Sequence, residues 1–233
     1  LSTAISETGD CSRRAADKLI ETGKVTVNGK IPELGTKVAA NDVIVVDGKV
    51  ITKEVAPVYL AFHKPVGITC TTERHVQGNI IDYINYPERI FPIGRLDKPS
   101  EGLIFMTNDG DIVNKILRSK NSHQKEYIVS VNKAITKNFI QKMGAGVPVL
   151  DHITEKCAVR KINETTFNII LTQGLNRQIR RMCDYLGYEV KTLKRIRIMN
   201  ITIDGIEKGK YRHFTVSELA NLNALIKNSS KTV

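Results

Sequence analysis

The first 49 residues alternate short apolar and polar stretches in a way that predicts a small module of helices and strands. The expected elements are helices over residues 1–7 and 12–22 and strands over residues 25–30 and 43–46. Ser12 is a favourable N-cap, because its hydroxyl accepts a backbone N–H of the first helical turn. Asp47-Gly48 predicts a tight hairpin, since both residue types tolerate the positive φ that such a turn requires.

The second helix of this module divides into an apolar and a basic side when its residues are placed about 100° apart. The apolar side consists of Ala15, Ala16, Leu19 and Ile20, and the basic residues are Arg13, Arg14 and Lys18. An ordinary solvated face accounts for the charges as well as an RNA-binding face does, so the pattern alone leaves both interpretations open.

Residues 50–57 are expected to be a linker that ends at Pro57, and residues 58–233 to form a second, larger domain. The strands expected there cover residues 58–62, 102–106, 126–131, 153–159 and 167–171, and helices are expected after Asn108, from Thr136 to about Met143, and over residues 174–186. Strands and helices follow no strict βαβ repeat, which favours an α+β fold.

Three arginines follow Gly174 in the run GLNRQIRRM. If this run is helical, Leu175, Ile179, Met182 and Leu186 form its buried side. Arg177 and Arg181 then point away from that side and suit phosphate contacts, whereas Arg180 lies at its flank. Arg180 is therefore the arginine expected to turn inward.

The net charge of +11 predicts a polyanionic partner. Residues 1–49 carry seven basic and seven acidic side chains, so the whole excess lies in residues 50–233. Near residue 194 the run LKRIRI interleaves basic and apolar side chains, as in a strand with one charged face. The larger domain is thus expected to carry most of the attraction for nucleic acid.

Several function classes receive no support from the sequence. The four cysteines and five histidines are dispersed, without the spacing of a metal site. Phosphate-cradling and dinucleotide-binding fingerprints are lacking too, so no cofactor is expected. Neither a signal peptide nor an apolar run of membrane-spanning length is recognisable, which leads us to expect a cytoplasmic monomer without a membrane partner.

Four motifs lie in order along the larger domain. They are HKPVG at residues 63–67, GRLDKPSEGLIFMTNDG at 94–110, KEY at 125–127 and GLNRQIRRM at 174–182. Together they resemble the RsuA/RluA superfamily of pseudouridine synthases, and SRRAADKLIETGKVTVNGK resembles the S-four-type RNA-binding domain. The resemblance implies a small N-terminal α/β RNA-binding domain and a catalytic domain with a mixed, largely antiparallel sheet.

The resemblance also implies roles for three residues. Asp97 in the GRLD loop is the expected catalytic carboxylate, and Tyr127 the aromatic on which the target base stacks. Burial disfavours the charged form of a carboxylate, and a neighbouring guanidinium opposes this effect. Arg180 is expected to supply that guanidinium.

Basic residues around the motifs are candidates for gripping RNA. Those outside the catalytic set are Arg13, Arg14, Lys18, Lys64, Arg95, Arg177, Arg181, Lys194 and Arg195. The closest motif similarity is to enzymes that modify large-subunit ribosomal RNA, with transfer RNA as a second expected substrate.

Three other interpretations stay open at this stage. A small-subunit ribosomal RNA target fits the same architecture. A non-catalytic ribosome-assembly protein would explain the charge, although it leaves the loop around Asp97 unexplained. A nucleoside hydrolase or glycosidase is the third. Typical glycosidases need two carboxylates, and the sequence offers one convincing candidate.

Overall fold

The computed structural model describes residues 1–39, 41–51, 56–117, 122–227 and 229. It divides the chain into two compact units: residues 1–58 with 86–90 and 108–110, and residues 59–85 with 91–107 and 111–233. Part of the expected linker, residues 52–55, lies outside the described residues, so the boundaries predicted from the sequence stay predictions. The two units are described separately below.

The N-terminal module has two helices and a small antiparallel sheet. The helices are α1 (Ser2–Glu7) and α2 (Arg13–Glu21), and the strands are β1 (Val25–Val27), β2 (Ile44–Val46) and β3 (Lys49–Val50). The Ser12 hydroxyl caps α2 by accepting the backbone N–H of Ala15. Asp47 and Gly48 both have positive φ, which confirms the hairpin between β2 and β3.

Five apolar side chains form the core of this module. They are Ile5, Ala16, Ile20, Val25 and Ile44. Ala15 was expected on the buried side of α2 but is exposed. Arg13, Arg14 and Lys18 are exposed as well, so the helix presents a basic surface to solvent.

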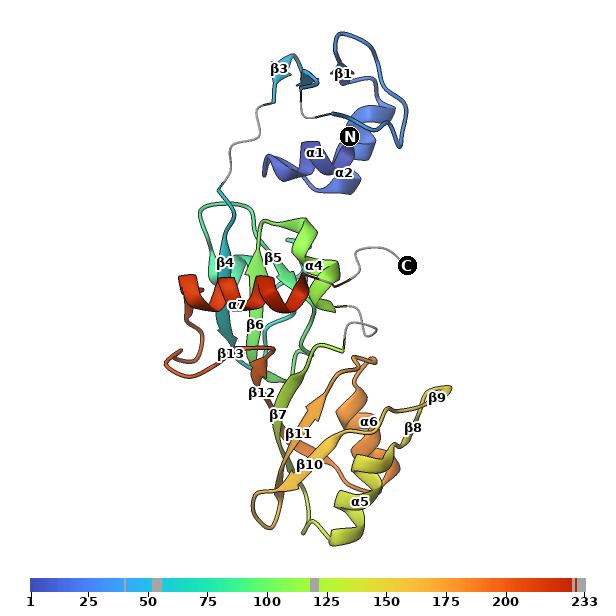
Figure 1. Ribbon diagram of the computed structural model, residues 1–233, viewed down its shortest axis with the longest axis vertical. Coiled ribbons are helices and arrows are strands. Elements are labelled where there is room, and N and C mark those ends of the chain that lie inside the picture. The colour runs from blue at the N-terminus through green and yellow to red at the C-terminus, as the bar shows by residue number, and fades with distance from the viewer. Residues whose placement is uncertain (40, 52–55, 118–121, 228, 230–233) are drawn as a thin grey trace. The chain divides into compact units, whose positions relative to one another are not determined.

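The second unit is built on a long mixed sheet with the order β10-β11-β7-β12-β6-β4-β14 (Figure 1). Its strands are β10 (Ala158–Lys161), β11 (Thr166–Leu171), β7 (Lys125–Val131), β12 (Val190–Ile198), β6 (Glu101–Thr107), β4 (Tyr59–Lys64) and β14 (Tyr211–His213). Within the described residues β6 and β12 are the parallel neighbours, and the other adjacent strands of this order run antiparallel. This confirms the mixed, largely antiparallel sheet.

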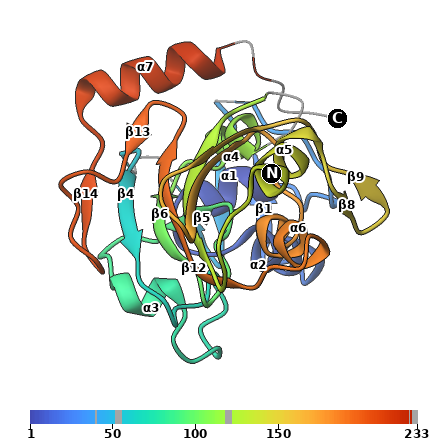
Figure 2. The same cartoon turned by 90° about the horizontal axis from the view of Figure 1, so that it is seen from below.

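Helices cover the two ends of this sheet, as Figures 1 and 2 show. Toward β6, α4 (Gly110–Leu117) and α7 (Val216–Ile226) contribute Ile116 and Leu222 to a core that includes Phe105. Toward β10 and β11, α5 (Lys137–Ala145) places Phe139 against Phe167, with ring centroids 5.3 Å apart. The GLNRQIRRM motif leads into α6 (Gln178–Tyr185), which packs near β12.

Some local expectations were wrong. The strand expected over residues 153–159 is divided, because His152–Ile153 (β9) pairs with Pro148–Val149 (β8) while residues 158–161 join the main sheet as β10. The helix expected from Gly174 begins only at Gln178. Short elements that the sequence did not reveal are α3 (Ile80–Ile84), β5 (Phe91–Ile93) and β13 (Ile201–Thr202).

No helix among the described residues is long and apolar enough to cross a membrane. The same part of the chain contains no group of three or more His, Cys, Asp or Glu side chains that could hold a metal ion.

Candidate active site

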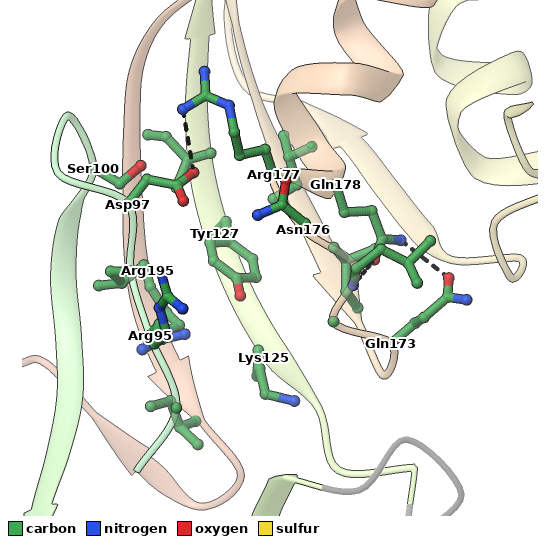
Figure 3. Close-up of a pocket in the computed structure, with 18 of the residues that line it drawn as sticks. Arg95, Asp97, Ser100, Lys125, Tyr127, Gln173, Asn176, Arg177, Gln178 and Arg195 are labelled. Atoms are coloured by element: carbon green, nitrogen blue, oxygen red, sulfur yellow. Dashed lines mark hydrogen bonds and ion pairs between the residues drawn. The ribbon is translucent and has the colours of Figure 1, made fainter. Parts of the chain in front are cut away.

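A pocket of about 430 Å³ lies in the second unit, at the centre of the long sheet. Its walls come from the loop before β6, from β7 and β12, and from the loop before α6. The polar and charged residues that line it include Arg180. The others, labelled in Figure 3, are Arg95, Asp97, Ser100, Lys125, Tyr127, Gln173, Asn176, Arg177, Gln178 and Arg195. Three of the sequence motifs therefore meet at this pocket.

Backbone hydrogen bonds fix the loop that carries Asp97. The N–H of Ser100 donates to the carbonyl of Asp97 at 2.9 Å, which closes a tight turn. The N–H of Gly67 donates to the carbonyl of Lys98 at 2.8 Å, so the HKPVG motif supports the turn from outside. The N–H of Leu96 donates to the buried thiol sulfur of Cys70 at 3.4 Å. Asp97 itself remains partly exposed toward the pocket.

Lys64 supports the same loop from the interior. Its side chain is fully buried, and Nζ donates to the carbonyls of Pro65 and Ser100 at 2.8 and 2.9 Å. Burial lowers the pKa of Lys64, and the nearby Cys70 and Asp97 oppose that effect. The RNA contact expected for Lys64 does not fit this position, since the side chain has no exposed surface to offer.

Two arginines lie beside the Asp97 carboxylate. Arg177 Nη1 is 3.8 Å and Arg180 Nε is 3.9 Å from Asp97 Oδ2. Arg180 also donates through Nη2 to Ser100 Oγ at 3.0 Å and to the carbonyl of Pro99 at 3.2 Å. Burial and the charge of Arg177 lower the pKa of Arg180, although a guanidinium stays protonated in proteins. The expected pairing of Asp97 with Arg180 is thus present in the geometry.

Arg177 does not lie where the helical pattern placed it. It is the N-cap of α6 and has φ of 51°, in the left-handed region, so its side chain does not follow the helix. This conformation turns the guanidinium toward Asp97, as Figure 3 shows. The expectation that only Arg180 turns inward was therefore wrong, because it assumed a helix starting at Gly174.

Tyr127 lies on β7, on the buried side of the strand, with 9% of its surface exposed. Opposite it on β12 is Arg195, whose guanidinium carbon is 6.0 Å from the centroid of the tyrosine ring. Figure 3 shows the ring within the pocket, between the part that holds Asp97 and the part that holds Lys125. An aromatic ring in this place provides a surface for stacking a flat base.

Lys125 and Arg195 are pocket residues whose burial the sequence did not reveal. Arg195 was expected to grip RNA at the surface but is 4% exposed, and its Nε donates to the carbonyl of Leu103 at 2.7 Å. Lys125 is 8% exposed, two residues before Tyr127 on the same face of β7. Burial and the charge of Arg195 lower the pKa of Lys125 to about 8. The signal that the sequence offered for Lys125 was its place in the KEY motif, two residues before Tyr127.

The other expected RNA contacts are distributed differently. Arg95 is exposed and lines the pocket. Arg181 is exposed and donates to the carbonyl of Asn176 at 3.0 Å. Lys194 lies 3.5 Å from Glu101, which also pairs with Lys208 at 2.9 Å. Their roles toward RNA stay predictions.

The pocket places one carboxylate beside two arginines and includes a tyrosine ring in its lining. A family model described as RNA pseudouridylate synthase matches residues 58–185, and the S4 domain model matches residues 1–44. The chain belongs to the RNA pseudouridylate synthase family. It is an isomerase that converts a uridine in RNA to pseudouridine.

Individual relatives agree with this assignment. The chain is 55% identical over 232 residues to the dual-specificity RNA pseudouridine synthase RluF of Salmonella typhi, covering 99% of this chain and 80% of that protein. It is 34% identical to the ribosomal large subunit pseudouridine synthase B of Bacillus subtilis, with 97% and 96% covered. A crystal structure of a pseudouridylate synthase superposes with a TM-score of 0.71 at 26% identity, covering 95% and 98%. These similarities confirm the RsuA/RluA-type synthase and the S-four-type domain that the motifs predicted, and RluF is among the relatives.

Proposed function

We propose that this enzyme isomerises a uridine of large-subunit ribosomal RNA and also accepts a transfer RNA uridine, acting as a cytoplasmic monomer. Support for the two substrates comes from relatives whose names specify dual specificity or the large ribosomal subunit. The exposed basic helix α2 and the net charge of +11 fit a large folded RNA. A small-subunit ribosomal RNA target is the alternative that the test below also covers.

The observation that carries the catalytic assignment is Asp97, placed between two arginines in a pocket lined by Tyr127. In this proposal the target uridine leaves its stack, and its base lies on the Tyr127 ring. Asp97 acts on the sugar as the bond from C1′ to N1 breaks. Arg180 and Arg177 lie beside the carboxylate as positive charges and hold it toward the pocket.

No step of this proposal requires a further component. The bond between C1′ and N1 breaks, and a bond between C1′ and C5 forms. Atoms and electrons therefore balance within the substrate. The hydrogen on C5 is released as a proton, and N1 gains one. The proposal therefore assigns no cofactor and no metal ion to the reaction.

The test uses RNA that carries tritium at C5 of uridine, because its release reports the new bond at C5. Wild-type protein and Asp97→Asn are compared on large-subunit RNA, small-subunit RNA and transfer RNA from a bacterium. We expect release from large-subunit and transfer RNA by the wild type alone. Release from small-subunit RNA only would overturn the proposed substrates, and undiminished release by Asp97→Asn would overturn the role of Asp97.

A further inference from the structure

Two buried cations in the active-site pocket have no acidic partner within the part of the chain that the structure describes. Lys125 and Arg195 both line the pocket, and both are more than nine-tenths buried. Among the described residues, no carboxylate is within ion-pair distance of either side chain. Asp97 is paired with Arg177 and Arg180 instead. The pocket thus carries positive charge that its own residues leave uncompensated.

Both cations also have hydrogen-bonding capacity to spare. Arg195 Nη2 is buried and makes no hydrogen bond to any described residue, while Nε is anchored on Leu103. The hydrogen bond that Lys125 Nζ makes, to the carbonyl of His123, is long at 3.4 Å. Burying charged donors without full partners is unfavourable, so such an arrangement indicates a ligand that completes it.

The position of the two cations restricts the ligand. They lie on adjacent strands β7 and β12, beside the ring of Tyr127, and Figure 3 shows Lys125 at the end of the ring where the hydroxyl points. A base stacked on that ring would bring its edge toward them. The groups that a uracil edge offers to donors are its carbonyl oxygens at C2 and C4, which accept hydrogen bonds.

The reaction also creates negative charge at this edge. When the bond from C1′ to N1 breaks, its electron pair remains on the uracil and is shared with both carbonyl oxygens. This holds whether Asp97 attacks the sugar carbon or removes a sugar proton. Fixed donors that meet a charge as it develops stabilise the transition state more than the bound substrate.

We propose that Lys125 and Arg195 bind a carbonyl oxygen of the target uracil and stabilise the negative charge of the detached base. Asp97 then serves the sugar end of the reaction, and the cation pair serves the base end. This inference rests on the family activity of the enzyme and not on which RNA is its substrate.

The first test compares Lys125→Met with Lys125→Arg by tritium release on one RNA substrate. Methionine fills a similar volume without charge, and we expect kcat to fall ~10²-fold, as for loss of one oxyanion donor elsewhere, with KM little changed. Arginine keeps the charge and should retain most of the activity. Lys142→Met is the matched control, because Lys142 is exposed on α5 and does not line this pocket.

Three outcomes contradict the proposal. An unchanged kcat in Lys125→Met would show that the lysine takes no part in the chemical step. A rise in KM alone would indicate a backbone phosphate as the ligand. Equal loss in Lys125→Arg and Lys125→Met, with intact folding by circular dichroism, would indicate a purely structural role. An inactive wild type would instead contradict the activity assignment, so the two failures are distinguishable.

A second test addresses the charge on the departing base. Fluorine at C5 withdraws electrons, so 5-fluorouracil needs less stabilisation as it leaves. With 5-fluorouridine at the target position, consumption of the intact nucleoside is measured after RNA digestion. We expect Lys125→Met to slow this consumption less than it slows the reaction of uridine. An equal slowing on both substrates would overturn leaving-group stabilisation.

Discussion

At the residue scale, the two arginines beside Asp97 are not equivalent. Arg180 has 14% of its side chain exposed and is tied to Ser100 and Pro99, whereas Arg177 has 45% exposed. The buried guanidinium is less screened by water and also holds the loop. Arg180 therefore contributes more to the placement of the carboxylate.

We expect Arg180→Met to lower kcat by ~10²-fold, in the range of a lost preorganised donor, and Arg177→Met to lower it several-fold less. Single-turnover tritium release at saturating RNA separates this effect from binding. Arg160→Met is the control, since Arg160 is exposed on β10 and does not line the pocket. Equal losses in the first two variants would argue that both arginines act as one unit.

The lowered pKa of Lys125 also predicts how the free energy of unfolding depends on pH. Its pKa is lowered to about 8 in the folded protein, from 10.5. Below pH 8 the lysine is charged in both the folded and the unfolded protein. The folded protein therefore bears the free-energy cost of burying the charge. Between pH 8 and 10.5 the unfolded chain binds more protons, so stability rises with pH. At neutral pH the shift corresponds to a penalty of about 3 kcal/mol.

Lys125→Met removes this penalty. We expect the variant to be more stable than the wild type at pH 7 in urea unfolding, and this advantage to shrink by pH 10. Lys142→Met, which removes an exposed charge, should show no such convergence. A difference between wild type and Lys125→Met that is constant from pH 7 to 10 would contradict the assigned shift.

The sequence predicted some of these residues better than others. Asp97, Tyr127 and Arg180 were singled out by the motifs around them, and the structure brings all three to one pocket. Lys64 and Arg195 were assigned to the surface because a basic side chain usually lies there. Their burial depends on acceptors such as the carbonyls of Ser100 and Leu103, which are distant in sequence and invisible before folding.

At the element scale, the central strands were predicted well from the sequence, and the connections between them poorly. The buried strands β6, β7 and β11 follow apolar patterns that tertiary structure reinforces. The first residues of the GLNRQIRRM motif form a loop, since Arg177 has a positive φ that a helix does not allow. The tertiary contact of this segment with Asp97 determines the loop. Local helix propensity carries no information about such a contact.

Gly102 allows the parallel pairing that brings β6 and β12 together. It has φ of 125°, and a Cβ there would clash with the backbone of Arg195. We expect Gly102→Ala to destabilise the fold by more than about 2 kcal/mol, as backbone strain at special positions does, and to abolish activity. Gly110→Ala at the start of α4, with open space around it, should be neutral or slightly stabilising. Thermal unfolding of both variants provides the measurement.

At the scale of the whole molecule, the N-terminal module is expected to add RNA affinity without shaping the pocket. Replacing Arg13, Arg14 and Lys18 together by glutamine removes three exposed charges from α2. We expect the slope of log affinity against log salt to decrease by about 2 units, because each phosphate contact releases counterions. Filter binding at several salt concentrations measures this slope, while kcat at saturating RNA should not change. An unaltered slope would argue that α2 does not contact RNA.

The pairing of β12 between β7 and β6 has a consequence for how the protein folds. Arg195 on β12 bonds to Leu103 on β6 across 92 residues of chain. Contacts between such distant segments close large loops, which slows folding and places them late. The pocket therefore cannot exist until residues 190–198 have been synthesised and have inserted between strands made much earlier. A growing chain on the ribosome thus stays catalytically silent until nearly all of this sequence has emerged.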